Sequence, residues 1–264
     1  MSQVTIVVPT YNKAAYIQRT LESIHAQTYR NWQLLIIDDA STDQTVAIAR
    51  RNSDPARTRI IVRKVNQGIC HVLNEALKHI RTEYFIQVDG DDWIERDAVQ
   101  VLYNAMSRQP ATTALAYGNT VHWHEHGGQP HYHKTVKQRS FASRYDFAVY
   151  DPMVQPRFYR TSCVRRVGGW EIDKLTGGRK MEDRRMLLRL LDHYRFVYVN
   201  RDLYHFRYHQ SNLSHDRNAA VYNKLRRFYT EKALQRWGGH YRCEMVGPPE
   251  LWQSIRLVST RRKT

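Results

Sequence analysis

The residues best suited to chemistry lie directly after an apolar run at positions 85–88. Asp89, Asp91 and Asp92 follow that run, with Gly90 between the first two. The run has the length of a short buried strand, and open α/β sheets bind ligands at the carboxyl ends of their strands. Neighbouring carboxylates repel one another unless a cation neutralises them, and such ligands suit Mg²⁺ or Mn²⁺ shared with a substrate diphosphate. The alternative is a solvated turn, because Asp and Gly are common turn residues.

The elements that would position these acids alternate along the N-terminal part of the chain. We expect strands at 4–9, 32–37, 59–64 and 84–88, and helices at 14–28, at 45–51 and after the turn 66–68 through 77–80. This order predicts an α/β fold with a mostly parallel, doubly wound sheet. The strands that precede positions 10, 38 and 89 would then end at one edge.

The rest of the chain is less regular. Helices are expected at 98–106 and 181–191, strands at 114–123, 158–164 and 196–199, and a loop or hairpin tip at 122–133. Beyond residue 215 the chain is basic and helical, with a turn at 247–249. We therefore expect one large domain over 1–215, with halves 1–95 and 96–215, and a short helical C-terminal extension over 216–264.

Charge restricts the partners of the chain. Lys and Arg number 41 against 25 Asp and Glu, a formal net charge of +16, which implies nucleic acid, an anionic membrane surface or a phosphorylated substrate. Three widely spaced cysteines, Cys70, Cys163 and Cys243, favour a reducing cytoplasm. We expect no signal peptide, and no apolar run reaches the roughly 18 residues of a membrane-spanning helix. Any membrane association would be peripheral.

The expected sheet edge carries the parts needed to hold a nucleoside diphosphate. Tyr11 offers an aromatic ring, Asp39 an acceptor for a base N–H, and Asp91 a metal ligand. The sequence has neither GxxxxGK[ST] nor GxGxxG, so a P-loop or an ordinary dinucleotide-binding fold is not expected. Without a glycine cradle, a metal ion would have to neutralise the phosphates.

Motifs in their expected order give the chain a family resemblance. The stretches VVPTYN (7–12), LESIHAQT (21–28), IIDDASTD (36–43), NQG (66–68) and DGDD (89–92) resemble the inverting GT-A glycosyltransferases of family 2. The segments 168–170, 181–183 and 204–209 fit more loosely. The resemblance implies a GT-A fold that transfers a sugar from a nucleotide-sugar, usually UDP-linked, to a hydroxyl acceptor. Residues 1–95 would bind the nucleotide-sugar and 96–215 the acceptor.

The resemblance also implies roles for single residues. Thr10 and Tyr11 would border the nucleobase and Asp39 would hydrogen-bond it. Asp89 would hold the ribose or a sugar hydroxyl, and Asp91 would bind Mn²⁺ or Mg²⁺. The other residues expected at the nucleotide-sugar are Pro9, Asn12, Asn66, Gly68, Gly90 and Arg207.

Asp183 is the expected catalytic residue. By resemblance it would be the general base that deprotonates the acceptor hydroxyl, and one base suffices for a single in-line displacement. The local sequence also allows a structural role, because Asp183 would lie at a helix N-terminus, where carboxylates are favoured. Arg207, His209 and Ser214 form an expected closing strip, with His209 as a second metal ligand and a plain surface loop as the alternative.

Two segments depart from a simple pattern. Many family members have Arg directly before the position of Asn74, where this chain has Leu73, so Arg63 or Lys64 would have to supply that phosphate contact. The histidines at 122, 124, 126, 131 and 133 permit a metal site, but no Cys or Asp accompanies them at metal-ligand spacing. A hairpin near the acceptor groove is the favoured interpretation.

The expected setting is bacterial surface polysaccharide or glycolipid synthesis, at the cytoplasmic face of a membrane. The acceptor would be a glycan, a lipid-linked molecule or a phosphate-bearing one. Two alternatives remain open: a metal-dependent nucleic-acid enzyme, and a binding module without catalysis. Tyr11 and Asp39 would have no role in the first, and intact Asp91 and Asp183 argue against the second.

Overall fold

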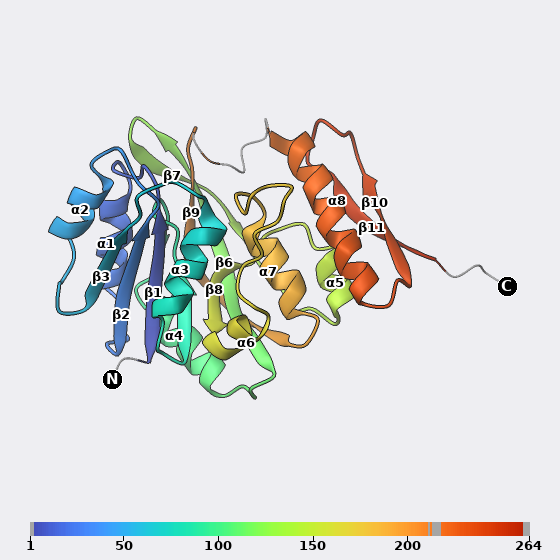
Figure 1. Ribbon diagram of the computed structural model, residues 1–264, viewed down its shortest axis with the longest axis horizontal. Coiled ribbons are helices and arrows are strands. Elements are labelled where there is room, and N and C mark those ends of the chain that lie inside the picture. The colour runs from blue at the N-terminus through green and yellow to red at the C-terminus, as the bar shows by residue number, and fades with distance from the viewer. Residues whose placement is uncertain (1–2, 211, 213–217, 261–264) are drawn as a thin grey trace.

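The computed structural model describes residues 3–210, 212 and 218–260. Its N-terminal part is a parallel sheet in the order β3-β2-β1-β4 with helical crossovers (Figure 1). The strands are β1 (Val4–Thr10), β2 (Trp32–Asp38), β3 (Thr58–Val62) and β4 (Tyr84–Gln87). The helices between them are α1 (Ile17–His25), α2 (Thr45–Arg51) and α3 (Ile69–His79). The predicted strand and helix order of this part is confirmed.

The sheet continues beyond β4 with strands of mixed direction. Its further elements are β5 (Trp93–Ile94), α4 (Ala98–Ser107), β6 (Thr113–His126), β7 (Gln129–Val136), α5 (Arg144–Ala148), β8 (Gln155–Arg160), α6 (Thr161–Arg166), α7 (Glu182–Leu190) and β9 (Arg195–Tyr208). The full order is β3-β2-β1-β4-β8-β6-β9-β5, with β7 paired to β6. Strands β6 and β9 run in the direction of β4, whereas β8, β5 and β7 run against it. The mostly parallel α/β sheet is therefore confirmed.

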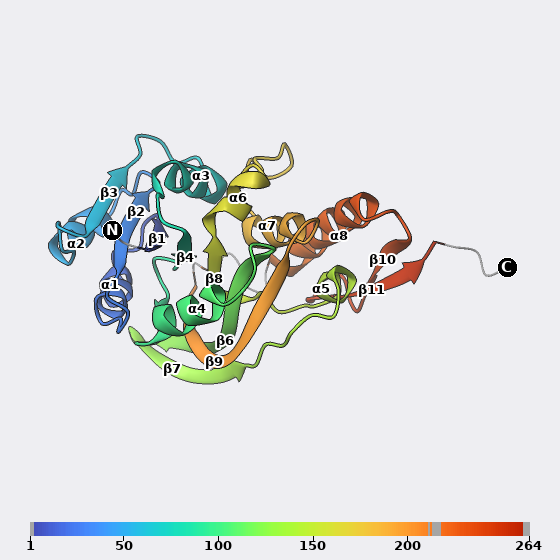
Figure 2. The same cartoon turned by 90° about the horizontal axis from the view of Figure 1, so that it is seen from below.

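Helices cover both faces of the sheet (Figure 2). Alternation along β1 shows how: Val4, Ile6 and Val8 face a core with α1 and α4, and Val7 faces a second core with α3, α6 and α7. Because both faces are covered, the strands read as continuous apolar runs. Their carboxyl ends meet at one edge, which places the candidate site.

The prediction for the C-terminal segment is only partly correct. Helix α8 (Ala219–Arg236) was expected, but the chain then forms a hairpin of β10 (Tyr241–Val246) and β11 (Ser254–Ser259) around the predicted turn (Figure 1). Tyr222, Leu225 and Tyr229 of α8 pack in the same core as α7. The extension is therefore a helix and a hairpin, not only helical.

Two other predicted strands were wrong in extent. The strand expected at 158–164 is β8 followed by α6, and the strand expected at 196–199 extends to Tyr208. Arg157 and Arg160 lie buried within β8, so the polar sequence of this strand does not indicate that it is buried. In β9, register shifts and a charged middle section interrupt the alternation that identifies a strand.

Candidate active site

The acidic loop after β4 packs against the end of β1. A Cβ on Gly90 would lie 3.0 Å from Thr10 Oγ1 and 3.3 Å from the carbonyl oxygen of Pro9. Only glycine fits this close approach without a shift of its neighbours. The predicted residues Pro9, Thr10 and Gly90 are thus brought together, and the flanking carboxylates are held at the sheet edge.

Asp92 ties the acidic loop to β9. Its Oδ2 accepts a hydrogen bond from Tyr204 Oη at 2.8 Å, and its Oδ1 accepts one from the backbone N–H of Arg207 at 2.9 Å. Burial, together with the charges of Asp91 and Asp89, raises the pKa of Asp92 well above its ordinary value. The buried carboxyl group of Asp92 thus anchors β9 through Tyr204 and the backbone of Arg207.

Asp91 has a different environment. Its Oδ2 accepts hydrogen bonds from Lys13 Nζ at 2.5 Å and from His209 Nε2 at 2.9 Å. Burial alone would raise the pKa of Asp91, but these two partners outweigh burial and lower it. The His209 ring stacks on Tyr16 with centroids 4.5 Å apart. The structure therefore brings together the two predicted metal ligands, and adds Lys13, which the sequence analysis did not consider.

Arg157 joins the acidic loop to the candidate base. Its Nη2 lies 3.3 Å from Asp89 Oδ2 and its Nη1 lies 3.3 Å from Asp183 Oδ2, and its side chain is only 2% exposed. Burial raises the pKa of Asp89, and the charge of Arg157 opposes that rise. The sequence analysis missed Arg157. The segment QPRFYR gives no clear strand pattern, and only the burial of Arg157 shows that it requires carboxylates nearby.

Asp183 lies in the first turn of α7, after Met181 at φ 59°. Its Oδ1 accepts the N–H of Arg184 at 2.6 Å, while its Oδ2 faces Arg157. One oxygen thus serves the helix terminus and the other faces Arg157, so the helix-terminal contact leaves Oδ2 directed at the acid cluster. Burial and the charge of Asp183 raise the pKa of the adjacent Glu182 to about 8.

Asp39 lies at the end of β2 among several donors. Its Oδ1 accepts from Arg63 Nη1 at 2.8 Å and from the N–H of Gln67 at 3.2 Å, and its Oδ2 accepts from the N–H of Gly68 at 2.7 Å. Asp39 therefore holds the 66–68 turn against β2. Each carboxylate oxygen has two acceptor positions, so Oδ2 retains capacity for one further donor.

A second cation lies on that turn. Arg179 donates from Nη1 to Asn66 Oδ1 at 2.6 Å and from Nη2 to the Asn66 carbonyl at 2.9 Å. Gly68 has φ +98°, and a Cβ there would lie 2.6 Å from Arg179 Cγ. Sequence reasoning missed Arg179, which follows a glycine pair in an otherwise irregular segment.

The loop after β1, which contains Tyr11 and Asn12, lies at the carboxyl edge of the sheet. Asn12 has φ +50°, its Oδ1 accepts the N–H of Thr42 at 2.9 Å, and its own N–H donates to Ser41 Oγ at 2.8 Å. These bonds fix the loop and leave Tyr11 43% exposed. An exposed ring on a fixed loop can stack on a base.

Packing explains why this chain has Leu73, and not an arginine, directly before Asn74. Leu73 is buried in the core of α3. Asn74 donates to the carbonyl of Trp170 and accepts its N–H, both at 2.8 Å. These residues join α3 to the 168–170 segment. Arg63 and Arg179 instead place cations beside Asp39 and Asn66.

Arg207 is buried behind the metal-side residues. Its guanidinium carbon lies 4.8 Å from the Tyr16 ring centroid and 5.2 Å from that of Trp93, and its Nη1 lies 3.7 Å from Glu125 Oε2. Because Tyr16 stacks on His209, the side chain of Arg207 supports the residue that contacts Asp91. Ser214, the last residue of the expected closing strip, lies outside the described residues.

The histidine tract forms a hairpin of β6 and β7, as favoured. His124 lies 4.4 Å from His133 and 5.0 Å from Tyr208 between ring centroids. Burial lowers the pKa of His122 to about 4. Within the described part of the chain, no group of three or more His, Cys, Asp or Glu side chains is arranged to hold a metal ion.

Comparison with known proteins decides the family. The sequence model described as Glycosyl transferase family 2 matches residues 5–167. The chain belongs to this family. Glycosyltransferase GlyA of Streptococcus pneumoniae is 28% identical over 228 residues, 80% of this chain and 31% of GlyA. The putative colanic acid biosynthesis glycosyl transferase WcaA of Escherichia coli is 32% identical over 118 residues, 44% of this chain and 42% of WcaA. The chain thus spans under half the length of either relative.

Solved structures confirm the fold. S. aureus TarS 1–349 in complex with UDP-GlcNAc superposes with a TM-score of 0.66 at 18% identity, over 89% of this chain and 72% of that one. The mannosyltransferase PcManGT of Pyrobaculum calidifontis, in complex with GDP-Man and Mn²⁺, gives 0.60 at 19% identity, over 94% and 66%. The predicted GT-A fold is therefore confirmed. Family membership favours the glycosyltransferase interpretation over a nucleic-acid enzyme.

Proposed function

We propose that this family 2 protein is a metal-dependent, inverting glycosyltransferase. It would move a sugar from a UDP-linked nucleotide-sugar to a hydroxyl acceptor. The observation that carries the proposal is the Arg157 bridge, which joins Asp89 of the donor-side loop to Asp183 on α7. TarS and PcManGT, which share the fold, were solved with UDP-GlcNAc and with GDP-Man and Mn²⁺. The name of WcaA supports a setting in bacterial surface polysaccharide or glycolipid synthesis.

The residues at Asp91 fit a hard divalent cation. Asp91 offers a carboxylate oxygen and His209 an imidazole nitrogen 2.9 Å from it. Mg²⁺ is commonly bound through one or two protein groups, water and substrate phosphates, so the two ligands suffice when a diphosphate is bound. A bound Mn²⁺ or Mg²⁺ would stabilise the negative charge of the leaving diphosphate. Lys13 adds a second positive charge at the same carboxylate oxygen.

Asp183 receives the proton in the proposed reaction. The acceptor hydroxyl gives its proton to Asp183 Oδ2 as its oxygen bonds to the anomeric carbon. The bond from that carbon to the diphosphate breaks, and the nucleoside diphosphate leaves with the electron pair on the opposite face. One displacement inverts the anomeric carbon. Arg157 fixes the orientation of the Asp183 carboxylate through its contact with Oδ2.

The nucleotide end would use the residues around β1 and β2. Tyr11 stacks on the base and Asp39 accepts its N–H through the remaining capacity of Oδ2. Asn66 and Gly68 form the adjacent wall. Arg63 and Arg179 place positive charge there in place of the arginine absent before Asn74.

The net charge of the chain indicates which class of acceptor suits it. A net charge of +16 suits a lipid-linked or phosphate-bearing glycan more than a neutral sugar. We propose that the protein works peripherally at the cytoplasmic face of an anionic membrane, with nucleic acid as an unlikely partner. Among the described residues, no helix combines the length and apolarity that crossing a membrane requires.

A thermal-shift screen of nucleotide-sugars, with and without Mn²⁺, tests the proposal. A ligand that binds only the folded state raises the melting temperature by mass action. We expect a UDP-sugar with Mn²⁺ to give the largest rise. Stabilisation by DNA or RNA, with none by any nucleotide-sugar, would contradict the proposed donor.

A further inference from the structure

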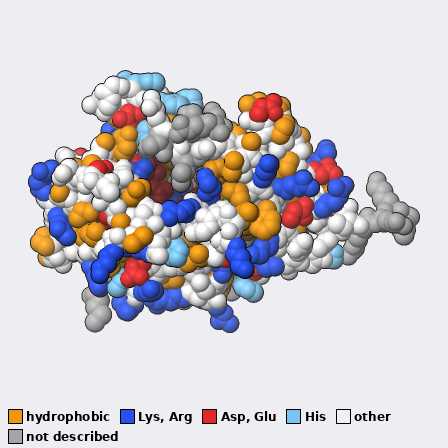
Figure 3. Space-filling model, turned by 45° about the horizontal axis from the view of Figure 1, so that its top comes forward, with side chains coloured by type: hydrophobic (Ala, Val, Ile, Leu, Met, Phe, Trp, Pro, Cys, Tyr) orange, Lys and Arg blue, Asp and Glu red, His pale blue; other side chains and the backbone are white. Residues whose placement is uncertain are grey.

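Large apolar side chains are exposed beside the Asp183 end of the site. They come from the loop before α7, the first turn of α8 and the β10–β11 turn: Ile172, Leu175, Val221, Leu251 and Trp252. With Lys174, Lys180 and Lys224 they are called the docking ridge below. Figure 3 shows the face that bears the site, where acidic side chains lie in a hollow and hydrophobic and basic side chains gather beside it.

The segments of the docking ridge adjoin one another. Lys180 Nζ lies 5.3 Å from the ring centroid of Tyr222, and that ring lies 5.8 Å from the ring of Trp252. Asn223 Nδ2 donates to the carbonyl of Leu251 at 2.6 Å. The loop before α7, the start of α8 and the hairpin turn therefore form one surface. Because Lys180 lies in the loop three residues before Asp183, that surface borders the proposed acceptor side.

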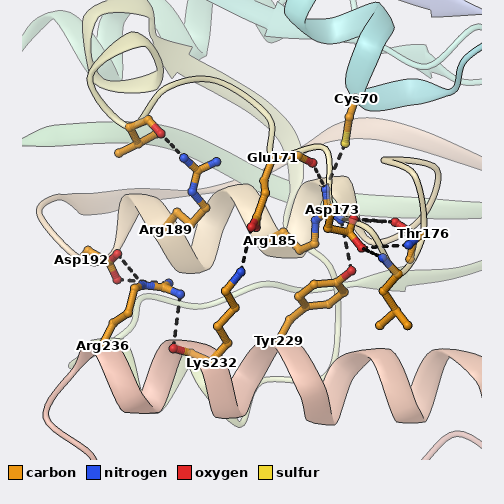
Figure 4. A network of polar contacts seen from close by, with 12 residues as sticks. Cys70, Glu171, Asp173, Thr176, Arg185, Arg189, Asp192, Tyr229, Lys232 and Arg236 are labelled. Carbon is orange, nitrogen blue, oxygen red and sulfur yellow. Dashed lines mark hydrogen bonds and ion pairs between the residues drawn. The ribbon is translucent and has the colours of Figure 1, made fainter.

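A buried network turns the apolar side chains of the loop outward (Figure 4). Arg185 binds the carboxylate of Asp173 and donates to Tyr229 Oη at 3.2 Å. Asp173 Oδ1 in turn accepts the N–H of Leu175 at 2.8 Å. The polar groups of the loop thus face α7 and α8, which leaves Ile172 48% and Leu175 60% exposed. Their exposure is fixed by the structure of the loop.

The charge of the docking ridge is positive. Lys174 and Lys224 are exposed and Lys180 is half-buried. The nearby acids Asp173 and Glu171 are paired with Arg185 and Lys232, while Glu250 adds an exposed carboxylate at the tip. Lysines interspersed with Trp and Leu suit an anionic bilayer, where lysine meets phosphate and the apolar groups enter the interface. A soluble polyanion would need the lysines but not Leu175, Leu251 or Trp252.

We propose that the docking ridge seats the protein on an anionic lipid bilayer, with Leu251 and Trp252 at the boundary between headgroups and acyl chains. Seated in this way, the Asp183 end of the site lies beside the lipid surface, where a lipid-borne acceptor reaches it. The delivery of the acceptor rests on the proposed function. The docking assigns a surface to the membrane association proposed above, and flotation measures it without any catalytic step, so docking and catalysis can fail separately.

Vesicle flotation tests the docking over a salt series. The full chain should float with phosphatidylcholine–phosphatidylglycerol vesicles and not with phosphatidylcholine alone, and rising salt should weaken binding. Each lysine near an anionic leaflet contributes about fivefold, or about 1 kcal/mol, so Lys174→Gln/Lys224→Gln should lose about 25-fold. Leu251→Ser/Trp252→Ser should lose at least tenfold. The matched control Arg50→Gln/Arg51→Gln, which removes exposed charge from α2, should lose less than either.

A spectroscopic readout locates the contact. Brominated lipids should quench the tryptophan fluorescence of the full chain, and Trp252→Phe should remove most of that quenching. Asp183→Asn should float like the unmodified chain, so a failed catalytic proposal leaves this result unchanged. Equal binding to both vesicles, equal loss in the α2 control, binding to soluble polyphosphate without vesicle binding, or a dimer abolished by Leu251→Ser/Trp252→Ser would overturn the inference.

Discussion

At the scale of residues, neighbouring acids have separate roles because their partners differ. Asp92 is buried against Tyr204 and the backbone of β9, whereas Asp91 meets Lys13 and His209. The sequence predicted the acid cluster and the pairing of Asp91 with His209. It did not reveal Arg157, because an arginine in the segment QPRFYR shows nothing of the carboxylates that the fold brings to it. Only the antiparallel pairing of β8 with β4 places Arg157 beside Asp89.

Asp91→Asn tests the metal role at this scale. We expect the variant to bind UDP with the same affinity in Mn²⁺ and in EDTA, because the charged oxygen ligand is lost. The unmodified chain should bind UDP more tightly in Mn²⁺. Titration calorimetry measures both. Asp92→Asn is the control, and it should lower the melting temperature while preserving the Mn²⁺ effect. A Mn²⁺ effect that survives in Asp91→Asn would contradict the assignment.

Arg157→Lys tests the bridge. Lysine keeps the charge but lacks the fork that reaches two carboxylates, so turnover should fall by roughly tenfold or more. Arg157→Gln should fall further and unfold at a lower temperature, because it leaves buried carboxylates without their cation. UDP release and thermal melts give both readouts. Unmodified turnover in Arg157→Lys would show that the bridge has only a structural role.

At the scale of elements, apolar runs and their spacing predicted β1 to β4 and α1 to α3 in order. These strands are buried on both faces, so their sequences are continuously apolar. Sequence patterns do not predict the elements where tertiary structure overrides them: β8 buries two arginines, β9 has register shifts, and the β10–β11 hairpin follows a basic helix. The acids that follow β2 and β4 could therefore be placed at one sheet edge from the sequence, whereas Arg157 and Arg179 could not be placed beside them.

Helix α7 supplies a prediction for pH. The pKa of Glu182 is raised to about 8, so the folded state binds its proton more tightly than the unfolded chain does. Its contribution to stability is complete below pH of about 4.5 and declines as pH rises to about 8. Glu182→Gln should therefore melt a few degrees above the unmodified chain at pH 9 and show no such gain at pH 5. Equal gains at both pH values would contradict the raised pKa.

At the scale of the whole molecule, Arg157 joins the acidic loop after β4 to α7, and the docking ridge begins in the loop directly before α7. Nucleotide-side residues come from β1 and β2, the candidate base from α7, and the ridge from the loop before α7 together with α8 and the hairpin. The C-terminal segment packs into the same core as α7. A core substitution in the C-terminal segment should therefore alter the packing of α7, which carries Asp183.

The central claim is that Asp183 is the general base of an inverting transfer, and one measurement tests it most directly. Release of UDP should be compared between Asp183→Asn and the unmodified chain at saturating donor, with Glu182→Gln as the matched control. We predict that turnover falls roughly 10²–10⁴-fold in Asp183→Asn while donor affinity is kept, and stays near normal at pH 7 in Glu182→Gln. Near-normal turnover in Asp183→Asn would contradict the claim, reduce Asp183 to a helix-terminal acid, and make Glu182 the next candidate.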